Sequence, residues 1–218
     1  MPLNLRQRSN FAVQHLMSAA RFARLCHKIE QENEGNRLGS FYDEIISYVT
    51  AAVFASVAAL EANINETFAD AMDGFISFQD LTSTELHKKW HLIERKPTLA
   101  KYQYALVMQK KDQMQENDCE YQFAYILIEV RNALVHFKPE WHDQQKKHDE
   151  IGEKLKGKFK LSPFVESGSP LFPTRCMTHG FADWSVETSL AFINSFSKKS
   201  GFPNRFAKFS NRLKTKAV

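Results

Sequence analysis

The most constraining stretch of this chain is a run of small and apolar residues in its first third. From Thr50 to Leu60 the side chains are Ala, Val, Phe, Ser, Thr and Leu, so a helix here is apolar on nearly every face. Such a helix must be central and closely packed against its neighbours. Ser40 is a suitable N-cap with two acidic residues just behind it, and the helix is expected to continue to about Ala71.

The same run sets an expectation about membranes and compartment. The uncharged stretch 45–60 is shorter than the roughly 20 residues that cross a bilayer, so a buried core helix is expected instead. Residues 1–10 are polar and do not resemble a secretory signal. Three widely spaced cysteines, Cys26, Cys119 and Cys176, suit neither a disulfide framework nor a zinc ribbon. The sequence therefore predicts a cytoplasmic protein with no membrane partner.

The remaining segments read as helices joined by short polar loops. Few glycines and prolines are present, and several apolar segments exceed strand length, which favours an all-α fold. Further helices are expected at about residues 5–29, 83–94, 98–109, 119–137, 140–156 and 180–199. The proline-containing segment 157–177 is interpreted as an ordered wrap on the bundle. One domain is predicted over 1–218, with a core at about 41–200 and a basic tail at 201–218.

An arginine and a histidine stand five positions apart near the end of the apolar helix 119–137. Arg131 and His136 are followed at once by Lys138-Pro139, and the residue before a proline disfavours the helical conformation. At about 100° per residue the two side chains lie roughly 140° apart around the helix. Asn132 and His136, four residues apart, are neighbours, so Asn132 is placed to orient the imidazole.

This pair suits one kind of chemistry, the attack of an RNA 2′-hydroxyl on the adjacent phosphate. Histidine moves protons near neutral pH, and the arginine fork stabilises charge on phosphate oxygens. That reaction needs no metal and no cofactor. Two copies of the helix across a two-fold axis would supply a separate acid and base. The competing interpretation is structural, because a basic side chain in the last turn is also a common helix end signal.

At these residues the chain resembles the HEPN superfamily. The segment Glu129–His136 matches the superfamily's arginine, polar residue and histidine late in a helix, with Asn132 as the polar residue. The continuation 137–141 and the Ala-rich segment 58–66 are also similar to bacterial stand-alone members. The resemblance covers about Phe41 to the final helix.

The resemblance implies a four- or five-helix up-and-down bundle, here with additional N- and C-terminal helices, usually as a homodimer. It implies metal-independent cleavage of single-stranded RNA in toxin–antitoxin, phage-defence or RNA-processing roles, with an antitoxin or defence protein as a further partner. Arg131 and His136 would carry the chemistry, supported by Asn132 and Glu129. Many toxin members have a tyrosine two residues after the histidine, and this chain has Lys138 there. Control by modification of that tyrosine is therefore in doubt.

Polar residues at the end of the Ala-rich helix are candidates for a supporting role. Glu61 and Asn65 follow the apolar centre directly and are candidate supporting residues. Glu61 and Glu66 are either catalytic carboxylates or acids that reach the rim of the motif cleft or form hydrogen bonds across the bundle, since buried polar groups need partners. These interpretations are open.

The positive charge of the chain is concentrated at its C-terminal end. Beyond Glu187 there are seven Lys or Arg residues and no acid, interleaved with phenylalanines. Lys138, Arg205, Lys208 and Arg212 are therefore candidate RNA-binding residues. In the alternative interpretation the tail is solubilising and its phenylalanines pack on the body. The alternative to a ribonuclease is a function of another class. In this alternative the protein is a non-catalytic module that binds RNA, a nucleotide or a protein.

Overall fold

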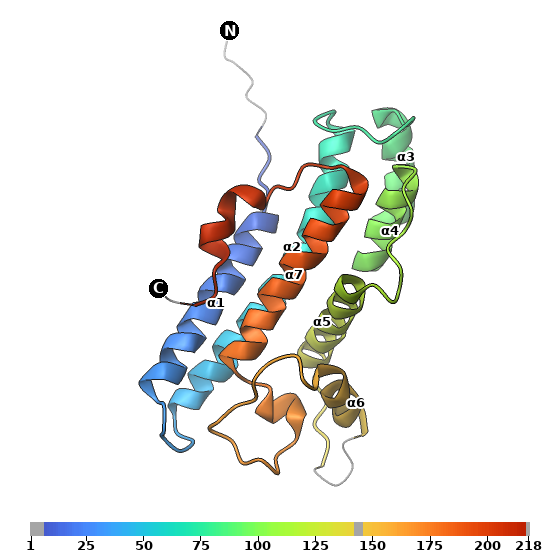
Figure 1. Cartoon of the computed structure of the whole chain (residues 1–218). Coiled ribbons are helices and arrows are strands. Elements are labelled where there is room, and N and C mark those ends of the chain that lie inside the picture. The colour runs from blue at the N-terminus through green and yellow to red at the C-terminus, as the bar shows by residue number, and fades with distance from the viewer. Residues whose placement is uncertain (1–6, 142–145, 217–218) are drawn as a thin grey trace.

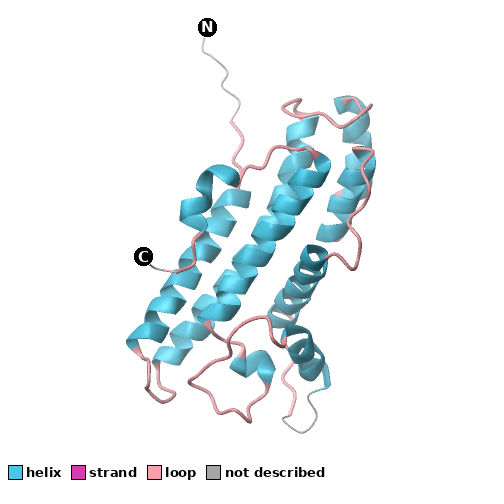
Figure 2. Ribbon diagram, in the orientation of Figure 1, coloured by secondary structure: helices cyan, strands magenta, loops and turns pink. Residues whose placement is uncertain are grey.

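The fold is all-α, as the sequence predicts (Figures 1 and 2). The computed structural model describes residues 7–141 and 146–216, and every regular element in these ranges is helical. The elements are α1 (Ala12–Glu32), α2 (Phe41–Met72), α3 (Ser83–Ile93), α4 (Thr98–Met108), α5 (Cys119–Val135), α6 (Lys146–Leu155), η1 (Leu171–Arg175), α7 (His179–Ser200) and η2 (Ala207–Leu213).

The long helices form an up-and-down bundle. In Figure 1, α2 and α7 run in one direction, while α1 and α5 run in the other. The shorter α4 continues the column of α5 along the same side of the bundle. The segment from Gly157 to Thr178 wraps the lower end of the bundle, and η2 lies against α1.

The central helix is α2, which packs against α1, α4, α5 and α7. By length and composition alone α2 could cross a membrane, but here its buried side chains form the middle of the bundle. The small side chains predicted to allow close packing do so. Ala52 and Ala59 are fully buried, and the Ser189 hydroxyl of α7 donates to the Ser56 carbonyl at 3.1 Å. A side chain as short as serine reaches a neighbouring backbone only where two helices approach closely.

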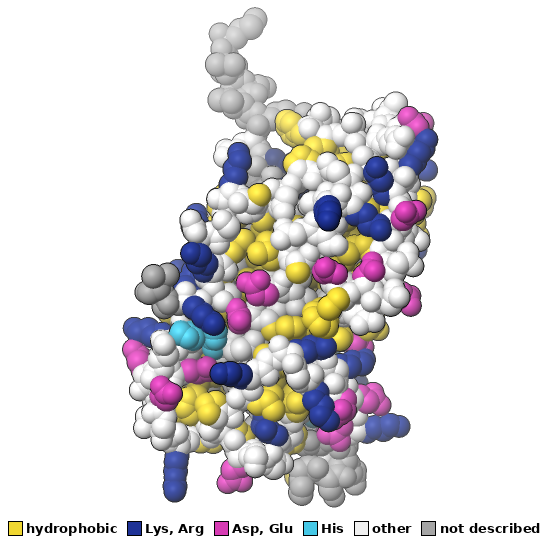
Figure 3. Space-filling view, viewed as in Figure 1, with side chains coloured by type: hydrophobic (Ala, Val, Ile, Leu, Met, Phe, Trp, Pro, Cys, Tyr) yellow, Lys and Arg dark blue, Asp and Glu magenta, His cyan; other side chains and the backbone are white. Residues whose placement is uncertain are grey.

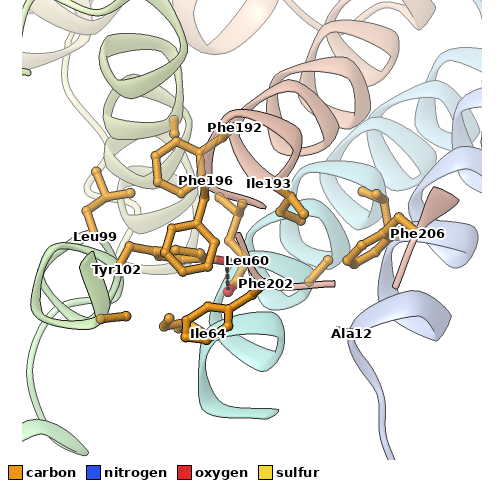
Figure 4. Close-up of a cluster of buried hydrophobic side chains, with 14 of the residues drawn as sticks. Ala12, Leu60, Ile64, Leu99, Tyr102, Phe192, Ile193, Phe196, Phe202 and Phe206 are labelled. Carbon is orange, nitrogen blue, oxygen red and sulfur yellow. Dashed lines mark hydrogen bonds between the residues drawn. The ribbon is translucent and has the colours of Figure 1, made fainter. Parts of the chain in front are cut away.

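A buried tyrosine joins α4 to the central helix. The Tyr102 hydroxyl donates to the Leu60 carbonyl at 2.8 Å and accepts from the Asn63 amide at 3.0 Å. Its ring meets Phe192 and Phe196 of α7 edge to face, with centroids 4.8 and 4.7 Å away (Figure 4). Tyr102 is fully buried, so both polar contacts and the aromatic packing belong to the core.

Several helix ends are set by side-chain contacts, and some of them differ from the sequence expectation. α1 begins at Ala12 instead of near residue 5, because the Glu66 carboxylate of α2 accepts the N–H groups of Phe11 and Ala12 at 2.6 and 2.8 Å. The expected Thr82 cap of α3 is confirmed as a full capping box with Glu85. Asp118 stands at the start of α5, but its carboxylate accepts from the Gln115 N–H at 2.8 Å and makes no cap bond.

The last helical segments also depart in part from expectation. α6 begins at Lys146, residues 137–141 are not helical, and the rest of its predicted first turn lies outside the described residues. The apolar residues of the predicted helix 140–156 make Trp141 and Leu155 its candidate anchors; Leu155 is buried, but Trp141 is 79% exposed, so it does not anchor α6.

The basic tail folds back on the bundle. Gly201 ends α7 in the left-handed conformation, with φ of 78°, as its position predicts. Phe202 and Phe206 are then buried in the core shared by α1, α2 and α7. Between them Arg205 forms ion pairs with Glu66 at 2.7 Å and Asp70 at 3.0 Å. The interpretation that the phenylalanines pack on the body is therefore confirmed.

Removing the Tyr102 hydroxyl tests how much the α4–α2 link contributes. Tyr102→Phe keeps the ring but removes the hydroxyl that accepts from the Asn63 amide and donates to the Leu60 carbonyl in the core. We expect the free energy of unfolding to fall by about 1–3 kcal/mol in urea denaturation. The control is Tyr104→Phe on the same helix, where the side chain is 41% exposed and little change is expected. Equal stabilities of the two variants would contradict the assignment.

Candidate functional site

The Arg131–His136 motif lies at the C-terminal end of α5, beside the wrap and α6. Leu127 and Val130 hold this end of α5 in the lower core, where they cluster with α2 and α7. Because these apolar positions face inward, the intervening polar positions face the edge of the bundle. The motif is thus carried by a packed helix and not by a loop, which fixes its backbone.

Arg131 is partly buried and its Nε atom is fully covered. No described residue accepts a hydrogen bond from that Nε, and no acidic side chain of residues 7–141 or 146–216 lies within ion-pair distance of the guanidinium. Arg8 and Arg205, in contrast, are both paired with carboxylates of α2. A guanidinium held against an apolar helix without a carboxylate partner retains its capacity to bind an anion.

His136 and Asn132 are exposed on the same end of α5. The helix ends at Val135, and His136 is its C-cap, with its backbone N–H bonded to the Asn132 carbonyl at 2.9 Å. This is the ordinary backbone bond of a helix end and does not involve the Asn132 side chain. No bond from the Asn132 side chain to the imidazole is present among the described residues.

The hydrogen-bond partner of Glu129 is a lysine of α6 and not a residue of the motif. Both of its carboxylate oxygens accept from Lys154 of α6 at 2.9 Å. The hydrogen bond to Glu129 raises the pKa of Lys154, so the ammonium form is favoured in the folded protein. This contact fastens α6 to the face of α5 that precedes the motif.

The structure does not bring Glu61 and Asn65 to the motif. Both bind the Lys101 ammonium of α4, at 3.4 and 3.0 Å, and Lys101 itself is only 2% exposed. The lower core that holds Val130 includes α2 only up to Val57, so Glu61 and Asn65 stand on later turns. Of the interpretations left open by the sequence, the structure shows the hydrogen bond across the bundle.

The candidate RNA-binding residues are dispersed. Lys138 is exposed beside the motif, and Lys208 and Arg212 are exposed on η2. Arg205 is occupied by its two carboxylate partners. On the face seen in Figure 3, Lys and Arg side chains are scattered among acidic and apolar ones and form no continuous basic surface.

An aromatic stack next to the motif was not predicted. The His148 ring of α6 lies on Phe137 at 5.2 Å and against Phe172 at 5.5 Å, and His148 is buried. The many charged residues of segment 140–156 predict that His142 and His148 face solvent; for His148 this prediction is wrong, and His142 lies outside the described residues. The stack orders the chain just after His136, and only the burial of the wrap, which is invisible in the local sequence, creates it.

Away from the motif, a cleft of about 810 Å³ lies between α1, α7 and the wrap. The rings of His27 and His179 meet at 4.5 Å there, and His179 Nε2 donates to the Thr215 carbonyl at 3.2 Å. Glu30 accepts the His179 N–H at 2.6 Å. Burial, then the neighbouring His27, lower the pKa of His179, while burial raises the pKa of Glu30. No spacing in the sequence signals this contact between the first helix and the last.

Comparison with known proteins adds no family to the fold described above. Within the described residues no group of three or more His, Cys, Asp or Glu side chains is placed to hold a metal ion. No family model, no curated protein and no solved structure matches this chain. Its geometry defines the protein as an all-α up-and-down bundle that carries a partly buried Arg131 and exposed Asn132 and His136 at the end of α5.

The His27–His179 contact predicts a pH dependence of stability. Because the folded pKa of His179 lies below its ordinary value of 6.5, the unfolded chain binds the proton more readily as pH falls. Stability contributed by this group is therefore lost below about pH 6.5. His179→Gln should show a smaller loss of unfolding free energy between about pH 7 and pH 5 than the native protein.

A Glu30→Gln variant serves as the control, because Glu30 acts with the opposite sign. Its raised pKa makes the folded state hold a proton more tightly, so its contribution to stability grows as pH falls towards 4.5. Urea midpoints at the two pH values measure both effects. Parallel pH profiles for the native protein and His179→Gln would rule out the role of His179.

Proposed function

We propose that this protein is a metal-independent endoribonuclease that cleaves single-stranded RNA at the Arg131–His136 motif. The observation that carries the proposal is the partly buried guanidinium of Arg131, which pairs with no carboxylate of the described residues and shares one packed helix end with the exposed imidazole of His136. The resemblance of residues 129–136 to the HEPN motif points to the same chemistry. We also propose a cytoplasmic protein that acts in RNA processing, phage defence or a toxin–antitoxin pair, with an antitoxin or defence protein as a further partner.

The reaction follows from what the two side chains can do. The RNA 2′-oxygen attacks the adjacent phosphorus, the P–O2′ bond forms and the P–O5′ bond breaks. The 2′-hydroxyl proton goes to a base and the leaving 5′-oxygen receives a proton from an acid, both roles suited to imidazole. Arg131 stabilises the charge that builds on the non-bridging oxygens. The products are a 2′,3′-cyclic phosphate and a 5′-hydroxyl.

A second copy of the chain completes this scheme. One imidazole cannot serve easily as base and acid in the same step, so we propose a homodimer in which two copies of α5 face each other. Exposed apolar side chains beside the motif support this arrangement, because Val135 is 48% and Phe137 45% exposed. Across a two-fold axis each of them would meet its symmetry mate or a neighbour of it.

The alternative function is a non-catalytic module that binds RNA, a nucleotide or a protein. The exposed Lys208 and Arg212 on η2 support it, because neither forms a side-chain ion pair with a described residue. Deletion of the tail does not test this alternative, because it would also remove Phe202 and Phe206 from the core. Substitution of exposed tail residues tests it instead.

Substitution of the motif tests the ribonuclease proposal. His136→Ala and Arg131→Ala should each lower the cleavage rate of a single-stranded RNA by at least about 100-fold. The measurement is gel analysis of end-labelled RNA in the presence of a chelator, with the ends analysed for 2′,3′-cyclic phosphate. His87→Ala, an exposed histidine on α3, is the matched control and should cleave normally. Undiminished cleavage by both motif variants would sink the proposal.

Charge reversal on the tail separates the two functions. Lys208→Glu with Arg212→Glu leaves the buried phenylalanines in place and should not change the fold. A binding module that uses the tail should lose most of its RNA affinity, with a weaker salt dependence, whereas motif-based cleavage should fall little. Filter binding at two salt concentrations measures this. Unchanged binding by the double variant would exclude the tail as an RNA-binding surface.

A further inference from the structure

A groove of about 710 Å³ lies between α4, α5 and the loop that joins them. The start of α4 forms one wall and the first half of α5 the other, with residues 113–116 closing the side. Three tyrosines line it, Tyr104 from α4 and Tyr121 and Tyr125 from α5. Its volume is in the range that holds a small organic group such as a nucleoside.

The groove is preformed because its loop is fastened to its walls. The Gln103 side chain donates to the Met114 carbonyl at 2.8 Å and accepts from the Met114 N–H at 3.0 Å. Met114 is buried beneath, and Asp118 fixes the next residue by accepting from the Gln115 N–H. A site held open by its own hydrogen bonds loses little free energy to ordering when a ligand enters.

Two of the three groove tyrosines, Tyr104 and Tyr125, are exposed and form no side-chain hydrogen bond with a described residue, whereas Tyr121 is half-buried and packs against the core. Tyr104 and Tyr125 are 41% and 51% exposed, and no described residue is hydrogen-bonded to their hydroxyls. Tyr42 and Tyr102, in contrast, both donate to backbone carbonyls. Glu116 is the one charged side chain that lines the groove. A flat aromatic ligand with polar edges fits these walls, and a phosphate does not.

The groove and the motif lie on a single helix. Tyr125 and Asn132 are seven residues apart, which places them on the same face of α5, about 10 Å apart along its axis. At about 100° per residue His136 falls near this face too, whereas Arg131 lies about 120° around the helix from Tyr125. A strand that runs along this face from His136 therefore presents a base at the level of Tyr125. The tyrosine groove suits the base, and the cationic motif suits the phosphate.

We propose that the Tyr104–Tyr121–Tyr125 groove is a base-binding subsite, which stacks a nucleobase of the single-stranded RNA whose phosphate lies at Arg131 and His136. The inference rests on the proposed ribonuclease function, and it assigns to α5 a second role in holding the substrate. Stacking on aromatic side chains is tolerant of base identity, so the subsite contributes affinity more than sequence preference.

The test measures RNA binding separately from cleavage. Fluorescence anisotropy of a labelled short single-stranded RNA is recorded with His136→Ala protein, which holds the strand without cutting it. Adding Tyr125→Ala or Tyr104→Ala should weaken binding about tenfold or more, while Tyr125→Phe should weaken it little. The matched control is Phe75→Ala, an aromatic side chain that is 75% exposed and lies outside the groove.

Each outcome has one meaning. Equal affinities of Tyr125→Ala, Tyr104→Ala and Phe75→Ala would overturn the subsite, even if the native protein cleaves RNA. Loss of a dimer in light scattering on Tyr125→Ala, without loss of RNA affinity, would also overturn it and assign the groove to a second copy of the chain. Failure of the native protein to cleave, with tyrosine-dependent binding retained, would reject the ribonuclease proposal and leave the groove as an RNA site.

Discussion

The close approach of three long helices around the small side chains of α2 is the constraint on which the rest of this structure depends. Ala52 and Ala59 add almost no bulk, so α1 and α7 come near enough for Ser189 to reach the Ser56 backbone. The buried side chains around these helices form two hydrophobic clusters, one that contains Tyr102 and one that contains Leu127 and Val130 of the motif helix. A larger side chain at either alanine would push a neighbouring helix outward and loosen the packing.

The fold follows from the sequence to the extent that signals are local. The small-residue run, the Thr82 capping box and Gly201 each act within a few residues, and the helices they define were predicted closely. The errors arise where a distant residue decides. α1 begins late because Glu66 caps it from another helix, and His148 is buried because the wrap covers it. Neither effect has a counterpart in periodicity or composition.

In the candidate site, too, local features were predicted and contacts between distant residues were not. Arg131, Asn132 and His136 are neighbours on one helix, so their shared location follows from the sequence. The supporting residues do not, because Glu129 is bound to α6 and Glu61 to Lys101 through contacts that no local pattern encodes. The tyrosine groove was missed because it joins two helices through a loop held by Gln103. A functional surface built across elements thus escapes a linear reading even when each element is predicted correctly.

The carboxylates at the end of α2 bind both ends of the chain. Glu66 receives the first N–H groups of α1 as well as Arg205, and Asp70 receives Arg8 as well as Arg205. During synthesis the chain emerges from its N-terminus, so these acids acquire half of their partners long before the other half exists. The bundle can be assembled but not closed until Arg205 has left the ribosome. A nascent chain that stalls before Arg205 keeps an open, acidic end.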